Sequence, residues 1–114
     1  MNGGSTNSVS LIAAVWNERP ILPHWINMLF DKKEGDIEII VVDGGSTDGS
    51  WEWLQDQKQI KIFRSDKGRT TQFHFGAQKA ICSILYFVHV DTVLPQGFDL
   101  LSVSYTHLTL PTKA

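Results

Sequence analysis

The chain has 114 residues, of which 42% are hydrophobic and 19% are charged, and its formal net charge is -2. A chain of this size and composition forms at most one globular domain, and the lack of a basic excess argues against a nucleic-acid partner. Cys82 is the single cysteine, so no internal disulfide and no cysteine-based zinc site is expected. We therefore expect a cytoplasmic protein; contact of a longer protein with a membrane surface stays open.

The two ends of the sequence differ in character from its middle. Residues 1–8 are rich in Gly, Ser and Asn, which predicts a flexible leader, and they lack the basic start of a signal peptide. The apolar run 9–16 is too short to span a bilayer, so no transmembrane segment is expected. Residues 102–114 have neither a helical face nor a strand pattern and resemble a translated sequencing adapter. We expect the genuine coding sequence within this chain to stop near Leu101 and the residues after it to be non-native.

Strand and helix patterns alternate along residues 9–101. Continuous apolar runs predict four strands, over 9–15, 37–42, 60–63 and 83–90. Prolines at 20 and 23 and apolar spacing predict a first helix that ends near Gly35, and two further helices are predicted over 48–57 and 70–81. Pro95 and Gly97 indicate a loop after the fourth strand. This alternation predicts an α/β fold: an open, mainly parallel sheet with helices on both faces.

Helical spacing predicts which side chains of the later helices face the sheet. In the second helix these are Trp51 and Leu54, and in the third they form a stripe of Phe73, Ala77, Ala80 and Ile81. Gly76 beside Ala77 indicates that the third helix packs closely.

Three polar side chains follow predicted strands: Asn17 after the first, Asp43 after the second and Asp91 after the fourth. If the strand order is 3-2-1-4, successive strands are added toward one edge of the sheet up to strand 3 and toward the other edge at strand 4. The crevice between strands 1 and 4, where this order reverses, is then the expected ligand site. The alternative is that each residue only forms a turn, since Asn after a strand and Asp before Gly-Gly are common in turns. The residues alone leave both interpretations open.

The stretch Val41-Val42-Asp43-Gly44-Gly45-Ser46-Thr47-Asp48-Gly49-Ser50 closely resembles the signature of family-2 glycosyltransferases of the GT-A fold, usually written Val-Val-Asp-Asp-Gly-Ser-Thr-Asp-Gly-Ser. Three more stretches are similar to that family: the first strand with Asn17-Glu18, then Gly68-Arg69 followed by Gln72 and Gly76-Ala77, and His89-Val90-Asp91-Thr92 at the place of the metal motif. The resemblance covers about residues 9–101. It is greatest to the subgroup with a His-Ala-Asp triplet, which includes enzymes of arsenosugar biosynthesis and selenodomain-associated transferases.

The resemblance implies a nucleoside-diphosphate sugar as donor, commonly UDP-linked, and Mg²⁺ or Mn²⁺ as cofactor. It implies that Asp43 accepts a hydrogen bond from the base and that Asp91 binds the metal. The donor-binding residues that it implies are Trp16, Asn17, Glu18, Asp43, Gly44 and Arg69. Gly44 stands in place of the second Asp of the usual pair, which removes a carboxylate from the ribose side. The acceptor is not indicated.

His89 stands in place of the first Asp of the metal triplet, so metal binding rests on Asp91 alone unless His89 contributes. As a strand residue, His89 is either packed or hydrogen-bonded, and we prefer the packed interpretation. We interpret His74 as structural and Cys82 as a small core residue. For Arg69, contact with the diphosphate and a solvated position at the helix start remain equal alternatives.

In the family the general base follows the metal motif, in an acceptor half that this sequence does not reach. We therefore expect a donor-binding half that is inactive alone. The alternative is a noncatalytic nucleotide-binding or regulatory module. A dinucleotide-dependent oxidoreductase is disfavoured, because no glycine fingerprint follows the first strand.

Overall fold

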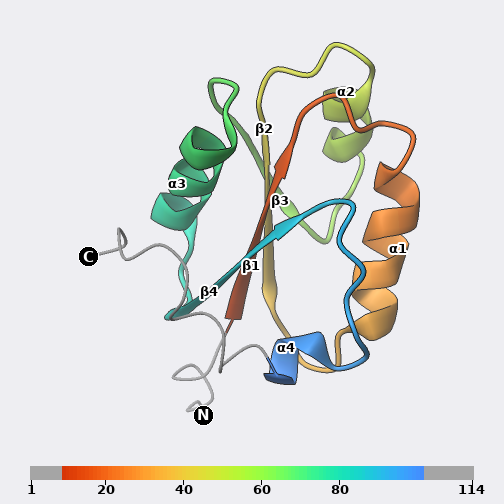
Figure 1. Ribbon diagram of the computed structural model, residues 1–114, viewed down its shortest axis with the longest axis vertical. Coiled ribbons are helices and arrows are strands. Elements are labelled where there is room, and N and C mark those ends of the chain that lie inside the picture. The colour runs from red at the N-terminus through yellow and green to blue at the C-terminus, as the bar shows by residue number, and fades with distance from the viewer. Residues whose placement is uncertain (1–8, 102–114) are drawn as a thin grey trace.

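The computed structural model describes residues 9–101, which form one α/β sheet structure (Figure 1). Its four parallel strands lie in the order β3-β2-β1-β4, which is the order that the expected ligand site requires. Their bounds are β1 Val9–Val15, β2 Glu38–Asp43, β3 Lys61–Arg64 and β4 Ile84–His89. Because β1 lies between β2 and β4 and both faces of the sheet are covered, its seven residues are all buried. This burial explains why β1 is apolar without alternation.

Helices cover both faces of the sheet (Figure 1), which confirms the predicted architecture. Their bounds are α1 Leu22–Lys32, α2 Ser50–Gln55, α3 Arg69–Lys79 and α4 Phe98–Leu101. On one face, α1 and α2 bury Trp25, Leu29 and Leu54 in the larger apolar cluster. On the other face, α3 packs Ala77 against Ile12 and other β-branched residues of β1 and β2. The four-residue α4 lies in the segment where the sequence indicated only a loop.

The close packing of α3 depends on Gly76. A β-carbon at this position would lie 2.5 Å from Cγ2 of Ile12 and 3.1 Å from Cγ2 of Val42. Both neighbours are completely buried in the sheet, so they have little freedom to move aside. Gly76 therefore lets the helix backbone approach the sheet at β1 and β2, as the sequence indicated.

Several side chains lie elsewhere than the sequence predicted. Ile81 was expected on the packing stripe of α3, but the helix ends at Lys79 and Ile81 is 78% exposed. In α2, Trp53 packs against the larger cluster, whereas the ring of Trp51 lies 4.7 Å from the guanidinium carbon of Arg64. Cys82, expected in the core, is only partly buried. The prediction for Ile81 was wrong because α3 ends two residues before it. Neither Trp51 nor Cys82 belongs to the two apolar clusters.

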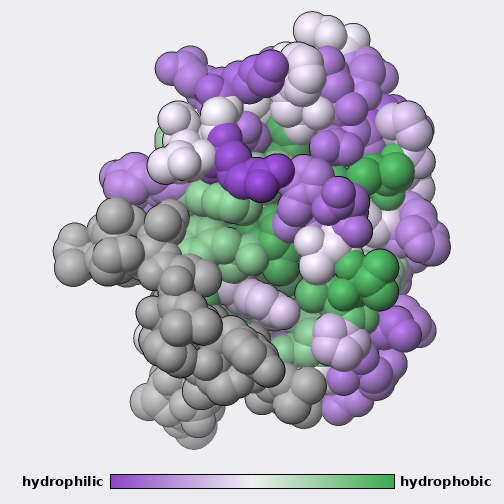
Figure 2. All heavy atoms as spheres, in the orientation of Figure 1, coloured by the Kyte–Doolittle hydropathy of each residue, from purple (hydrophilic) through white to green (hydrophobic). Residues whose placement is uncertain are grey.

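Hydrophilic side chains prevail at the upper end of the view in Figure 2, where the parallel strands finish, and hydrophobic ones lie lower on this face. Within residues 9–101, no helix is both long and apolar enough to cross a membrane. The predicted leader, residues 1–8, and the predicted non-native tail, residues 102–114, lie outside the described part of the chain.

Candidate functional site

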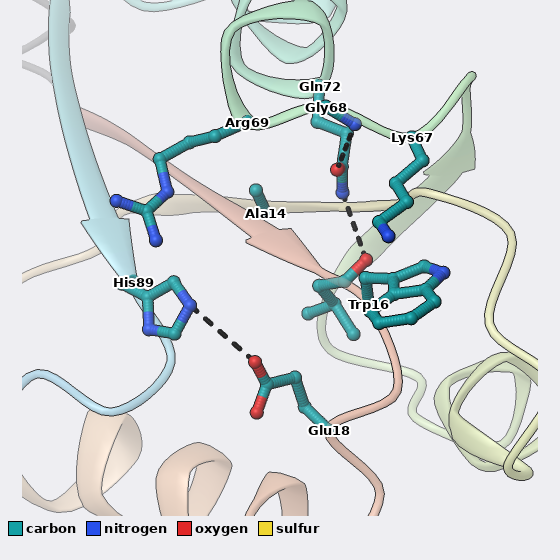
Figure 3. Close-up of a pocket in the computed structure, with 9 residues that line it drawn as sticks. Ala14, Trp16, Glu18, Lys67, Gly68, Arg69, Gln72 and His89 are labelled. Atoms are coloured by element: carbon teal, nitrogen blue, oxygen red, sulfur yellow. Dashed lines mark hydrogen bonds and ion pairs between the residues drawn. The ribbon is translucent and has the colours of Figure 1, made fainter.

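A pocket of about 210 Å³ opens where β1 and β4 end, at the reversal of strand order (Figure 3). The end of β1 and the loop after it form one wall, the start of α3 forms a second, and the end of β4 forms a third. The lining residues are Ala14, Val15, Trp16, Glu18, Lys67, Gly68, Arg69, Gln72 and His89. The pocket lies at the edge of an open parallel sheet where such folds bind ligands.

The start of α3 makes one side of this pocket electropositive. Lys67 and Arg69 flank Gly68, and in Figure 3 the Arg69 side chain extends along the wall toward His89 while Lys67 lies on the opposite side. The first N–H groups of a helix lack intrahelical partners and carry partial positive charge. Two cationic side chains together with these N–H groups suit an anionic ligand such as a phosphate.

Trp16 lies on the same side of the pocket as Lys67 (Figure 3). Its indole is 41% exposed, although it is one of the largest apolar side chains of the protein. The Nζ atom of Lys67 lies 3.6 Å from the centroid of the indole ring, a cation–π contact. An exposed aromatic face beside a cationic wall can take a planar ring next to a phosphate.

His89 links two carboxylates at the opposite side of the pocket. Its Nδ1 atom lies 2.6 Å from Oδ1 of Asp91, and its Nε2 atom lies 3.5 Å from Oε2 of Glu18. The side chain is 27% exposed and lines the pocket. Our interpretation of His89 as a packed strand residue is therefore wrong, because β4 ends here and its last side chain projects beyond the sheet.

A metal at this site would depend on Asp91. Among the described residues, no three side chains of His, Cys, Asp or Glu are grouped so that they could hold a metal by themselves. The Asp91 carboxylate is 71% exposed and uses Oδ1 for His89. A single accessible carboxylate fits Mg²⁺ or Mn²⁺ when phosphate oxygens and water complete the coordination. The donor set therefore suits a cation that arrives with a phosphorylated ligand.

Asp43 is completely buried at the end of β2 and does not line the pocket. Its Oδ2 atom accepts hydrogen bonds from the N–H groups of Gly45 and Ser46, both at 2.8 Å, and its Oδ1 atom accepts one from the Ser46 hydroxyl at 2.6 Å. Arg64 lies 3.4 Å from Oδ2 and also donates to the carbonyl of Ser46. In this arrangement Asp43 organises the glycine turn, and its role in base recognition stays a prediction.

Asn17 holds the loop after β1 against this turn. Its backbone takes a left-handed conformation with φ 53°, its N–H donates to the Ser46 hydroxyl, and its Oδ1 atom accepts from the N–H of Thr47 at 2.8 Å. Asp48 adds a second link by accepting from the N–H of Arg19 at 3.0 Å. Burial raises the pKa of Asp48, but hydrogen bonds from Ser50 and Arg19 outweigh it and lower that pKa below its ordinary value. Asn17 thus positions the loop from which Trp16 and Glu18 reach the pocket.

The structure therefore divides the predicted site residues. Trp16, Glu18 and Arg69 line the pocket; Asn17, Asp43 and Gly44 lie behind it in the supporting turns; Asp91 contacts it through His89. His74, exposed on α3 and 3.2 Å from Nε2 of Gln78, takes no part in the pocket lining.

Sequence reasoning missed Lys67 and the role of Gln72. Lys67 was not among the expected site residues, although basic residues beside a glycine at the start of a helix suit an anionic ligand. Gln72 falls on the same helical face as Gly76 and Ala77, and a polar residue on a buried face needs hydrogen-bond partners. A polar residue at a position expected to be buried was therefore the signal in the sequence that pointed to a structural role for Gln72.

The four-stranded parallel open sheet matches the N-terminal part of GT-A transferases. The sequence profile described as Glycosyl transferase family 2 matches residues 10–103, and the chain belongs to this family. It is also 33% identical over 91 residues to an uncharacterized glycosyltransferase of Nostoc sp., a match that covers 75% of this chain and 28% of that protein.

Solved structures share the fold at low sequence identity. Residues 1–349 of S. aureus TarS match with a TM-score of 0.70 and 16% identity, over 89% of this chain and 32% of that TarS fragment. The mannosyltransferase PcManGT from Pyrobaculum calidifontis, solved with GDP-Man and Mn²⁺, matches with a TM-score of 0.69 and 21% identity, over 91% of this chain and 33% of PcManGT. The chain thus spans about a third of the length of these relatives.

Proposed function

We propose that this chain is the donor-binding part of a glycosyltransferase and binds a nucleoside-diphosphate sugar, UDP-linked in the first instance, in the pocket between β1, α3 and β4. The observation that carries the proposal is the pairing of Lys67 and Arg69 at the start of α3, opposite the Glu18, His89 and Asp91 group. TarS was solved with UDP and with UDP-GlcNAc, and PcManGT with GDP-Man, which supports this ligand class.

In this proposal each wall recognises a different part of the donor. Arg69 and Lys67 bind the diphosphate, for which the guanidinium fork of Arg69 is well suited. Trp16 contacts the planar base. Glu18 and His89 close the pocket on the side from which the sugar projects.

Asp91 would hold the divalent cation, with diphosphate oxygens and water as its other ligands. When bound, the cation would stabilise negative charge on the departing nucleoside diphosphate. His89 would orient the Asp91 carboxylate through Nδ1. Acceptor binding and the general base belong, in this proposal, to parts of the relatives that this chain does not span.

Calorimetric titration of the purified chain with UDP and with GDP, with and without Mn²⁺, tests the proposal. We expect UDP to bind, Arg69→Ala to weaken it about tenfold or more, and Asp91→Ala to remove the dependence on Mn²⁺. Lys58→Ala, an exposed lysine outside the pocket, is the matched charge control and should leave the affinity unchanged. If neither nucleotide binds, or if binding survives both substitutions with its metal dependence intact, the proposed function is wrong.

A further inference from the structure

Gln72 lies on α3 at the back of the pocket, and its amide joins three separate segments of the chain. The side chain is 3% exposed. Its Nε2 atom donates to the carbonyl of Val15 at 2.9 Å and to the carbonyl of Val42 at 2.7 Å, while its Oε1 atom accepts from the N–H of Gly68 at 3.1 Å. One amide thus contacts the end of β1, the end of β2 and the start of α3, and both of its N–H bonds are used.

Gly44 lies directly against this amide. A β-carbon at Gly44 would stand 2.7 Å from Oε1 and 2.9 Å from Cδ of Gln72, and 3.1 Å from Cα of Lys67. The backbone N–H of Gly44 donates to the same Val15 carbonyl, at 2.9 Å, that Gln72 contacts. A side chain at position 44 and the bound amide of Gln72 therefore need the same space.

The two observations explain each other. Gly44 does not have a positive φ, so its backbone conformation alone does not demand glycine. Neighbouring Gly45 has φ 96° and nothing within 4 Å of its β-carbon position, so there the conformation, and not the space, favours glycine. At position 44 the constraint is the space itself, taken first by the amide of Gln72 and, at a longer distance, by Cα of Lys67.

We propose that Gln72 is the positioning residue of the donor pocket: it holds the start of α3, with Lys67 and Arg69, against the ends of β1 and β2, and it excludes any side chain at position 44. The first part of this inference rests on the proposed function. Its consequence is that the wall beside β2 carries a neutral amide where the usual family signature has a second carboxylate.

Binding of UDP and of uridine to Gln72→Met tests the positioning role. Methionine keeps the length of the side chain and removes its hydrogen bonds, so the start of α3 loses its link to the sheet. Because Lys67 and Arg69 would face the phosphates, we expect UDP affinity to fall about tenfold or more, and uridine affinity, followed by NMR titration, to change less than about twofold.

Gln78→Met, the same change at an exposed glutamine of α3, is the control and should bind both ligands as the wild type does. If the wild type binds UDP and Gln72→Met binds it equally well, the positioning role is overturned. An equal loss for uridine and UDP would overturn it as well, because the effect would then not be confined to the phosphate side.

A thermal-unfolding cycle tests the exclusion without any ligand. Gly44→Ala should lower the melting temperature by about 4 °C or more in the wild type and by less than about 2 °C in the Gln72→Ala background, where the amide is gone. Gly45→Ala places an alanine at a positive φ but against no neighbouring atom, so it should lower the melting temperature equally in both backgrounds. An equal cost of Gly44→Ala in both backgrounds would overturn the exclusion.

This cycle separates the two proposals. Failure of the wild type to bind UDP and GDP contradicts the proposed function and with it the positioning role, whereas the exclusion of a side chain by Gln72 is decided by the melting temperatures alone.

Discussion

Asp43→Asn removes one charge from a completely buried group and keeps its shape, so it isolates the part that the carboxylate plays in the glycine turn. The Asp43 carboxylate accepts three short hydrogen bonds, from the N–H groups of Gly45 and Ser46 and from the Ser46 hydroxyl, and a fourth, longer one from Nε of Arg64. Hydrogen bonds to charged groups contribute about 1.5–3 kcal/mol and neutral ones about 0.5–1.5 kcal/mol. An asparagine also replaces one carboxylate oxygen by an NH₂ group, which cannot accept a hydrogen bond from the surrounding donors.

Weakening two or three such bonds should lower the free energy of unfolding by about 2–3 kcal/mol. The half-exposed Arg64 adds little to this value, since its pairing with Asp43 is long and partly screened. For a domain of this size the loss corresponds to a melting temperature lower by roughly 10–20 °C. We expect the effect to be on stability rather than on ligand contact, because Asp43 does not line the pocket.

Urea unfolding at pH 7, followed by tryptophan fluorescence, measures this loss. Asp66→Asn, the same change at an exposed aspartate, is the control and should stay within about 0.5 kcal/mol of the wild type. The reasoning is refuted if Asp43→Asn is as stable as Asp66→Asn. If the folded variant is stable but has lost UDP binding, the base-recognition role implied by the family resemblance is favoured over the turn role.

Two further predictions concern parts of the fold that support the pocket. Gly76→Ala should destabilise the chain by about 1–2 kcal/mol, since a β-carbon only 2.5 Å from Ile12 costs about 2–3 kcal/mol, the upper part of the overpacking range, and helix propensity returns about 1 kcal/mol. Thermal unfolding measures this loss, and a variant as stable as the wild type would contradict the close approach of α3. Burial raises the pKa of Glu38, but hydrogen bonds from Lys61, Ser10 and the N–H of Ile81 outweigh it and lower that pKa below its ordinary value. Glu38 therefore stabilises the fold at neutral pH, and this contribution is lost as the pH falls below about 5. Glu38→Gln should cost about 1 kcal/mol at pH 7 and less at pH 3; an equal cost at both pH values, by urea unfolding, would show that its ionisation is irrelevant.

The sheet could be predicted from the sequence because the hydrophobic pattern of each strand shows whether one or both of its faces are buried. Runs such as Ile39-Ile40-Val41-Val42 are apolar without alternation because both faces are covered, and the alternation of strands and helices then restricts the topology to a few arrangements. Element ends were less predictable: α2 and α3 stop two residues before their predicted ends, so Ile81 is exposed where packing was expected.

The site was only partly predictable, because proximity in space decides what a strand-end residue does. Trp16, Glu18 and Arg69 line the pocket as expected, whereas Asp43 turns its carboxylate into the glycine turn. Gln72 contacts Val15, which is 57 residues away in sequence. No local sequence pattern predicts a contact between residues so far apart in sequence. A polar residue on the buried face of α3 does indicate that it has a hydrogen-bond partner.

A crystal structure of the chain grown with UDP and Mn²⁺, with the Mn²⁺ located by its anomalous signal, tests the central proposal most directly. We predict that the uracil ring lies beside Trp16 and that the diphosphate contacts Lys67 and Arg69 at the start of α3. We predict the Mn²⁺ within coordination distance of Asp91. A nucleotide bound elsewhere on the chain, or a diphosphate that contacts neither Lys67 nor Arg69, would contradict the account.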